Sequence, residues 1–286
     1  MHIPDGFLAT PVWASLDVAA APALWWIARR AQNTLDDMRI PRLGVMGAFV
    51  FAAQMIDFPV AAGTTAHLVG GALLAMTLGP FAASAVMAAI LAIQALVFQD
   101  GGILALGANT INMAILGVLA GYAPYHYFGL GRWRRVAVFS GGALSVLVSA
   151  AMALSELRLS GVPPRILGAS VVVFTIAALL EGAITVGVLE ALESIQPGFV
   201  RTPAQRRGFA LGAAGLAAIL LATVGVQFAA AGPDGIEKIA HDAGVAYQAA
   251  SAGSAWPVKA AAGLAGLALI YALCIVAARA ARRRSA

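Results

Sequence analysis

The chain has 286 residues, of which 61% are hydrophobic and 11% are charged, and its mean hydropathy is +0.87. Soluble domains carry about 25% charged residues, so the composition excludes a water-soluble fold and predicts a polytopic membrane protein within the lipid bilayer. The net charge of +5 does not indicate nucleic-acid binding, because the arginines lie between hydrophobic segments. The single cysteine, Cys274, lies in an apolar run and excludes a disulfide framework.

The hydrophobic segments predict an all-α transmembrane helical bundle of about nine spans. They cover residues 11–28, 43–57, 67–78, 80–98, 104–124, 136–154, 166–190, 208–229 and 257–278. The longer segments approach the roughly 20 residues that a helix needs to cross the hydrocarbon core. The segments at 43–57 and 67–78 are short, so the number of complete crossings there stays approximate.

The positions of the basic residues predict the orientation. With the N-terminus outside the cytoplasm, 14 of the 18 Lys and Arg residues fall in inner segments: Arg29, Arg30, Arg39, Arg42, Arg132, Arg134, Arg135, Arg201, Arg206, Arg207, Arg279, Arg282, Arg283 and Arg284. The positive-inside rule therefore predicts an outer N-terminus and a cytoplasmic C-terminus in a multi-pass protein of the cell inner membrane. Residues 1–10 lack the basic start of a signal peptide, so we expect Met1 to be retained.

The first two residues offer an unusual set of nitrogen donors. Met1 supplies an α-amine, and His2 supplies an imidazole and a backbone amide that can lose its proton. A short, nitrogen-rich chelate suits a square-planar or tetragonal ion such as Ni(II), Cu(II) or Co(II) rather than Mg²⁺ or Ca²⁺. On these residues alone, His2 as an ordinary surface residue stays an alternative.

His67 is the candidate for a second imidazole ligand. Of the other histidines, His126 lies beside inner arginines and His241 is expected in an outer polar loop. On the predicted topology His2 and His67 share the outer face, and His67 stands at the mouth of a span. A histidine is costly to bury there, which favours a functional role; a loop or capping histidine is the alternative.

Six motifs in chain order resemble a known family. They are Met1–Leu8 (MHIPDGFL), Gly63–His67 (GTTAH), Gln94–Leu96 (QAL), Asp100–Gly102 (DGG), Leu106–Met113 (LGANTINM) and Glu181–Thr185 (EGAIT). Together they resemble the CbiM/NikM family, the substrate-binding membrane components of energy-coupling-factor transporters for cobalt and nickel. The resemblance covers about residues 1–195.

The resemblance implies how the ion is held. The N-terminal segment folds back into the bundle, and four nitrogens form a plane around the ion. In this chain they are the Met1 amine, the His2 amide nitrogen and imidazole, and the His67 imidazole. Such a plane favours a d⁸ ion, Ni(II), and binding releases protons. Ni²⁺ or Co²⁺ is then the transported substrate, with no permanent cofactor and no catalytic residue, and the choice between the two ions stays open.

Several polar residues are candidates for supporting roles. Asp5 either accepts a hydrogen bond from an imidazole N–H or forms a turn. Asn109 and Asn112 lie three residues apart on one helix face, and either anchor the N-terminal segment or hold helices together. Asp100 is expected in a structural outer turn. Glu181 is expected to hydrogen-bond two helices, with a proton relay as the alternative.

The tail carries a second resemblance. Gly232–Ala240 (GPDGIEKIA) is similar to the Pro-Asp-Gly-Leu-Glu motif of the small accessory component CbiN/NikN, with Ile236 in place of Leu. An ordinary turn is the alternative for Pro-Asp-Gly. We therefore expect a metal-binding component at 1–195, a cytoplasmic linker at 196–207, and a two-span accessory domain at 208–286 whose outer loop carries Asp234 and Glu237. The tail is expected to matter for transport more than for capture of the ion.

The chain contains no phosphate-binding loop, since neither Lys238 nor Lys259 stands in the required motif. The resemblance therefore implies partners: two CbiO/NikO-like ATPase subunits and a CbiQ/NikQ-like coupling transmembrane subunit. Small residues at Ala19 and Ala23 are a candidate docking face for the latter. The expected function is the non-enzymatic capture component of an ATP-driven importer. The alternative, an ion-coupled secondary divalent-metal transporter, needs paired intramembrane charges, and a membrane metalloenzyme needs an open coordination position.

Overall fold

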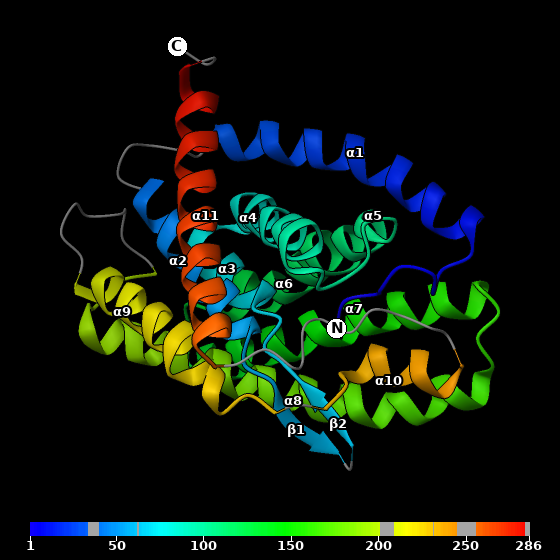
Figure 1. Cartoon of the computed structure of the whole chain (residues 1–286). Helices are drawn as coiled ribbons and strands as arrows, with labels where there is room; N and C mark the ends of the chain where they lie inside the picture. The colour runs from blue at the N-terminus through cyan, green and yellow to red at the C-terminus, as the bar shows by residue number, and fades with distance from the viewer. Residues whose placement is uncertain (34–39, 62, 201–208, 231, 245–255, 284–286) are drawn as a thin grey trace.

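The computed structural model describes residues 1–33, 40–61, 63–200, 209–230, 232–244 and 256–283. Its helices are α1 (Thr10–Gln32), α2 (Ile40–Gln54), α3 (Gly71–Leu78), α4 (Pro80–Ile93), η1 (Gln94–Phe98), α5 (Leu106–Asn109), η2 (Thr110–Gly117), α6 (Val118–Phe128), α7 (Arg134–Leu159), α8 (Pro164–Ile195), α9 (Phe209–Thr223), η3 (Gly225–Gln227), α10 (Gly235–Asp242) and α11 (Trp256–Arg283). Strands β1 (Phe58–Ala61) and β2 (Thr64–Ala66) pair antiparallel, with Phe58 opposite Ala66. Figure 1 shows a helical bundle with this hairpin at one edge.

The prediction of a helical, multi-pass membrane protein is confirmed. Among the described residues, six helical segments are long and apolar enough to cross a membrane: Pro80–Phe98, Leu106–Phe128, Arg134–Leu159, Pro164–Ile195, Phe209–Gln227 and Trp256–Ala280. The sequence predicted about nine spans, and the difference lies in the first three. α1 carries Asp17, Arg29 and Arg30, α2 is a shorter apolar helix, and the segment at 67–78 contains only an eight-residue helix.

Several arginines that predict the orientation lie in parts of the chain that the structure does not describe. Arg39, Arg201, Arg206, Arg207 and Arg284, which were used for the orientation, lie outside the described residues, as does the predicted linker beyond Val200. Arg134 and Arg135 are described, and they pair with Glu193 and Glu190 near the end of α8. These ion pairs place the predicted inner ends of α7 and α8 side by side.

Close helix packing depends on small residues at the contacts. A Cβ added to Gly142 of α7 would stand 2.8 Å from the Cα of Gly182 in α8 and 2.9 Å from the carbonyl oxygen of Glu181. Glycine at both positions therefore lets the two backbones approach, as in other membrane helix pairs. α1 is fixed differently, because the Asp17 carboxylate accepts the backbone N–H of Gly107 at 2.7 Å.

The segment from residue 209 onward packs into the same bundle. α9 and α11 both lie along α2, and α10 lies on α8 beside β2. The approach is tight, because a Cβ added to Gly266 of α11 would collide with the Phe51 ring of α2. Packing of this kind makes the tail part of the molecule's core.

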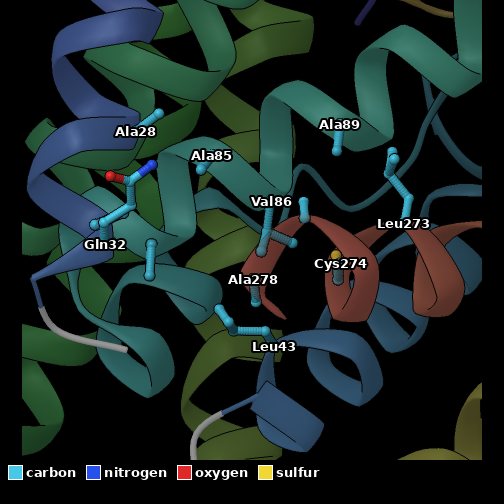
Figure 2. Close-up of a pocket in the computed structure, with 12 residues that line it drawn as sticks. Ala28, Gln32, Leu43, Ala85, Val86, Ala89, Leu273, Cys274 and Ala278 are labelled. Atoms are coloured by element: carbon cyan, nitrogen blue, oxygen red, sulfur yellow. The ribbon is translucent and has the colours of Figure 1, made fainter. Parts of the chain in front are cut away.

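A cavity of about 210 Å³ lies between α1, α2, α4 and α11 (Figure 2). Alanines line most of it, together with Val86, Leu43 and Cys274, and Gln32 is its polar side chain. This lining contains no histidine or carboxylate, so the cavity offers no site for a metal ion of the expected kind.

Candidate metal site

The N-terminal segment runs into the bundle, where Met1, His2 and Ile3 are each at most 8% exposed. Asn109 holds it by two hydrogen bonds to the backbone of Ile3, accepting the N–H at 2.8 Å and donating to the carbonyl at 3.1 Å. The N–H of Gly102 donates to the same carbonyl at 2.8 Å. Of the two roles expected for Asn109, the structure therefore has the anchor.

Asp5 fastens the same segment from the other side. Its carboxylate accepts the backbone N–H groups of Ile103 and Leu104 at 3.0 and 2.8 Å. The expected hydrogen bond from an imidazole is made by Asp100 instead, whose Oδ1 lies 3.0 Å from Nδ1 of His2. The reason is the loop 99–105, which places the Asp100 carboxylate at the ring and leaves Asp5 facing backbone N–H groups.

His67 follows β2, and its ring orientation is set by its neighbour. Nδ1 lies 2.9 Å from the carbonyl oxygen of Leu68, an acceptor that fixes the Nδ1–H tautomer and leaves the lone pair on Nε2. Nε2 stands 2.6 Å from the α-amine nitrogen of Met1. The expected second imidazole therefore meets the expected amine.

The backbone after His67 is held on both sides by buried polar side chains. Glu181 accepts the N–H groups of Val69 and Gly70 at 2.8 and 2.7 Å, while Gln54 donates to the Val69 carbonyl at 2.7 Å. Gln94 in turn donates to Gln54 at 2.8 Å. Glu181 thus joins α8 to the start of α3, which is the hydrogen-bonding role expected for it.

The two candidate histidine rings stack on each other, with centroids 5.1 Å apart and planes 14° from parallel. Both are buried, at 4% exposure for His2 and 9% for His67. Nε2 of His2 has no hydrogen-bond partner among the described residues. An unpaired buried nitrogen of this kind is unusual.

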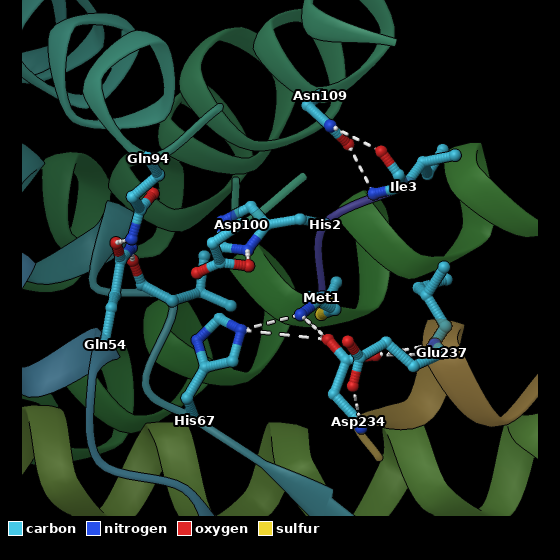
Figure 3. A network of polar contacts seen from close by, with 12 residues as sticks. Met1, His2, Ile3, Gln54, His67, Gln94, Asp100, Asn109, Asp234 and Glu237 are labelled. Atoms are coloured by element: carbon cyan, nitrogen blue, oxygen red, sulfur yellow. Dashed lines mark hydrogen bonds and ion pairs between the residues drawn. The ribbon is translucent and has the colours of Figure 1, made fainter. Parts of the chain in front are cut away.

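Asp234, from the tail, completes the cluster in Figure 3. Its Oδ2 forms an ion pair with the Met1 amine and lies 3.9 Å from Nε2 of His67. Its Oδ1 caps α10 by accepting the N–H groups of Ile236 and Glu237 at 2.7 and 2.8 Å. Glu237 accepts the Asp234 N–H at 2.9 Å, which completes a capping box.

Burial and neighbouring charges shift the pKa values of three side chains near the Met1 amine. Burial, and then the charge of the Met1 amine, lower the pKa of His67, so its imidazole is neutral. Burial raises the pKa of Asp234, but the charge of the Met1 amine and its hydrogen bond lower it, and the pKa stays below the usual range. The charge of His2 and its hydrogen bond likewise lower the pKa of Asp100 against the effect of burial. The site therefore combines a neutral imidazole with two ionised carboxylates.

Side chains alone do not make this site. Among the described residues, no three His, Cys, Asp or Glu side chains are placed to hold one ion. The expected donor set is not made of side chains alone, because two of its four nitrogens belong to the backbone of Met1 and His2. A cavity of about 10 Å³ borders Met1, His67 and Asp234, which is room for about one water-sized particle.

The geometry also shows what binding requires of His2. An imidazole that chelates together with its own amide nitrogen closes a six-membered ring through Nδ1. In the structure Nδ1 of His2 faces Asp100. The planar arrangement therefore requires Nδ1 to exchange the carboxylate for the ion.

Asn112 lies away from the N-terminal segment. Its Nδ2 donates to Glu156 of α7 at 2.8 Å, and its backbone carbonyl accepts from the Ser149 hydroxyl at 2.9 Å. These contacts join η2 to α7, the helix-packing alternative. Sequence reasoning assigned Asp100 to a structural turn and left open whether the tail reaches the ion. For Asp100, the available sequence signal was its place directly before Gly101 and Gly102.

The chain matches the family model "CbiM: Cobalt uptake substrate-specific transmembrane region" over residues 2–199. A putative metal transport protein of Haloquadratum walsbyi is 38% identical over 71% of this chain and 94% of its own. A fused nickel transport protein, NikMN, of Rhodobacter capsulatus is 33% identical over 90% of this chain and 82% of its own.

The putative fused nickel transport protein NikMN of Archaeoglobus fulgidus is 37% identical over 71% of this chain and 69% of its own. The solved structure of a truncated transition metal transporter is 34% identical, covers 68% of this chain and 99% of its own, and superimposes with a TM-score of 0.59. The chain therefore belongs to the CbiM family, as a CbiM/NikM-type component fused to a NikN-like segment.

Proposed function

We propose that the chain is a membrane component of cobalt or nickel transport that captures Ni²⁺ or Co²⁺ at Met1, His2 and His67. The observation that carries the proposal is the 2.6 Å approach of the Met1 amine to Nε2 of His67 inside a buried site. The relatives include proteins named as a fused nickel transport protein and a cobalt transport protein, which agrees with the proposal.

Four nitrogens bind the ion in this proposal: the Met1 amine, the amide and imidazole nitrogens of His2, and Nε2 of His67. The amine and the amide nitrogen each give up a proton as they bind, so protons leave as the ion enters. A plane of strong nitrogen donors suits Ni(II), and proton release makes the affinity rise with pH. Asn109 and Asp5 hold the segment in place, which reduces the ordering needed on binding.

Capture takes place on the extracytoplasmic side. In support, the backbone N–H of Ala9 donates to Ser160 in the turn between α7 and α8, whereas the Arg134–Glu193 pair joins the opposite ends of those helices. The positive-inside rule assigns the arginine end to the cytoplasm. The amine and His67 then belong to the outer half of the bundle.

Energy comes from partners, namely a coupling transmembrane subunit and two ATPase subunits. The chain divides into a metal-binding component at 1–195, a linker at 196–207 and an accessory domain at 208–286. α1 exposes Val18, Trp25 and Trp26 on its outer side, which suits a helix that lies against lipid or a partner.

The test is metal content. Purified protein with its native N-terminus is exposed to equal Ni²⁺ and Co²⁺, washed and analysed by mass spectrometry. About one ion per chain supports capture, and none contradicts it. Uptake measured in cells with and without the ATPase and coupling subunits then separates an ATP-driven importer from a secondary transporter, which would work alone.

A further inference from the structure

Asp234 lies outside the region that matches the family model, yet it touches the Met1 amine. Strand β2 holds the two residues that precede Asp234. The N–H of Thr65 donates to the Pro233 carbonyl at 2.9 Å, and its hydroxyl donates to the Gly232 carbonyl at 3.0 Å. Thr65 and Asp234 also form an isolated parallel β-bridge. The tail is thus held against the strand that leads to His67.

The position of the carboxylate is fixed by α10. Ile236 and Ile239 are fully buried in the core, and a Cβ added to Gly235 would stand 2.9 Å from the Phe174 ring of α8. The Asp234 cap is the first residue of this docked unit. Because Oδ1 is occupied by the cap, only Oδ2 faces the amine and His67.

Asp234 is buried, and a carboxylate in such a place needs a positively charged partner or hydrogen-bond donors beside it. The Met1 amine is that charged partner in the structure. A divalent ion bound to the amine and His67 would also place positive charge beside this carboxylate. The arrangement therefore suits both the free and the loaded site.

We propose that Asp234 is a positioning residue of the metal site. It holds the Met1 amine against His67 and supplies negative charge beside the captured dication. This inference rests on the proposed function. It adds how the tail affects capture of the ion: α10 fixes the position of the Asp234 carboxylate, and the carboxylate fixes the position of the Met1 amine. It departs from the expectation that the tail matters for transport more than for capture of the ion.

The test uses the full chain with its native N-terminus and the variant Asp234→Asn. Asparagine caps helices about as well as aspartate, so this change removes the charge and keeps the cap. Isothermal titration with Ni²⁺ measures the affinity, and amide hydrogen exchange of α10 measures its docking. We expect the affinity to fall about 10–100-fold, the range found when a group that orients metal ligands is removed, with α10 protection unchanged.

Asp242→Asn is the matched control. It removes the same charge from the other end of α10, where the Asp242 side chain is 42% exposed and pairs with Lys238. Its Ni²⁺ affinity should equal that of the unchanged protein. This comparison separates the local effect of Asp234 from the general loss of one negative charge.

Wild-type affinity in Asp234→Asn would overturn the inference. So would an affinity that falls only together with α10 protection, because Asp234 would then be a structural anchor and no more. A starting protein that binds neither Ni²⁺ nor Co²⁺ would instead overturn the proposed function itself. The two failures are therefore distinguishable.

Discussion

At the residue scale, each histidine ring has one nitrogen already engaged. Nδ1 of His67 is bound to the Leu68 carbonyl, and Nδ1 of His2 to Asp100, while Nε2 of His67 faces the Met1 amine. Removing either ring takes away a nitrogen that no other described histidine can replace, since His126 and His241 are exposed.

His2→Ala and His67→Ala are each expected to abolish high-affinity binding of Ni²⁺ or Co²⁺ while the protein stays folded. Isothermal titration measures the binding, and thermal unfolding checks the fold. His241→Ala is the control, because its side chain is 78% exposed although it lies on the same helix as the Asp234 cap. Near-normal affinity in either ligand variant would contradict the proposed donor set.

One extra residue before Met1 is expected to damage binding as severely as the loss of His2. The addition converts the amine into an amide and moves the charged terminus away from His67, although both histidines remain. Metal binding by N-terminally and C-terminally extended proteins is compared in the same titration. Equal affinity in the two would mean that the amine is not a ligand.

His2 and His67 were predicted from the sequence because a terminal amine, a histidine and a polar outer segment each have their own chemistry. Asp100 and Asp234 were harder, since a carboxylate beside glycine reads as a turn residue in either place. What decides their role is distance. Asp234 meets Met1 across 233 positions of the chain, and nothing in its local sequence encodes that contact.

At the scale of single elements, the loop 99–105 follows the π-helical segment η1 and leads into α5, which continues into a second π-helical segment, η2. Such segments are rare and often occur at functional sites. Directly after η1, Gln99 and Gly101 both have positive φ, and the backbone then turns toward the N-terminal segment. The loop presents Gly102, Ile103 and Leu104 as donors to that segment.

Gly102→Ala is expected to weaken metal binding. Its Cβ would stand 2.6 Å from the nitrogen of Asp5 and 2.9 Å from the carbonyl carbon of Pro4, so backbone has to move. Crowding of this kind costs about 1–3 kcal/mol. Titration with Ni²⁺ and thermal unfolding measure the effect.

Gly187→Ala is the control for this change, because a Cβ at Gly187 of α8 meets nothing within 4 Å. It should leave the affinity unchanged. Loss of affinity in the control, or none in Gly102→Ala, would show that the fit of the loop against the N-terminal segment does not limit binding.

Hydropathy located the long helices well because an apolar run of span length has few other uses. It was less informative at 67–78, where four residues before α3 are irregular and buried. Their backbone is satisfied by Glu181 and Gln54, side chains from α8 and α2. Composition alone does not distinguish such a segment from a helix. For the same reason, the sequence did not predict the hairpin β1–β2.

At the scale of the whole molecule, the tail and the first 200 residues share one charged region. Asp57, between α2 and β1, accepts the N–H of Ala230 through its carbonyl. Burial, and then the negative charge of Asp234, raise the pKa of its carboxyl to about 7. An unfolded chain has no such burial, and the carboxyl titrates near 3.8.

The contribution of Asp57 to the stability of the metal-free protein is therefore expected to fall as the pH rises from about 4 to about 7, while the lowered pKa of His67 acts in the opposite sense over much of that range. Over that range the unfolded chain has lost the Asp57 proton while the folded protein still binds it, so raising the pH favours unfolding. Melting temperatures at pH 5 and pH 8 measure the effect. Asp57→Asn should unfold at a higher temperature than the unchanged protein at pH 8, and the same pH dependence in both would rule out Asp57 as its source.

The buried amine has a consequence for how the protein is made. Met1 and its neighbours are sealed between the loop 99–105, β2 and the start of α10. Enzymes that deformylate, acetylate or trim an amino terminus need an accessible end. Any such maturation must finish before the chain inserts and closes. On the proposed donor set, molecules that fold with a blocked end would lack the amine ligand and would not capture the ion.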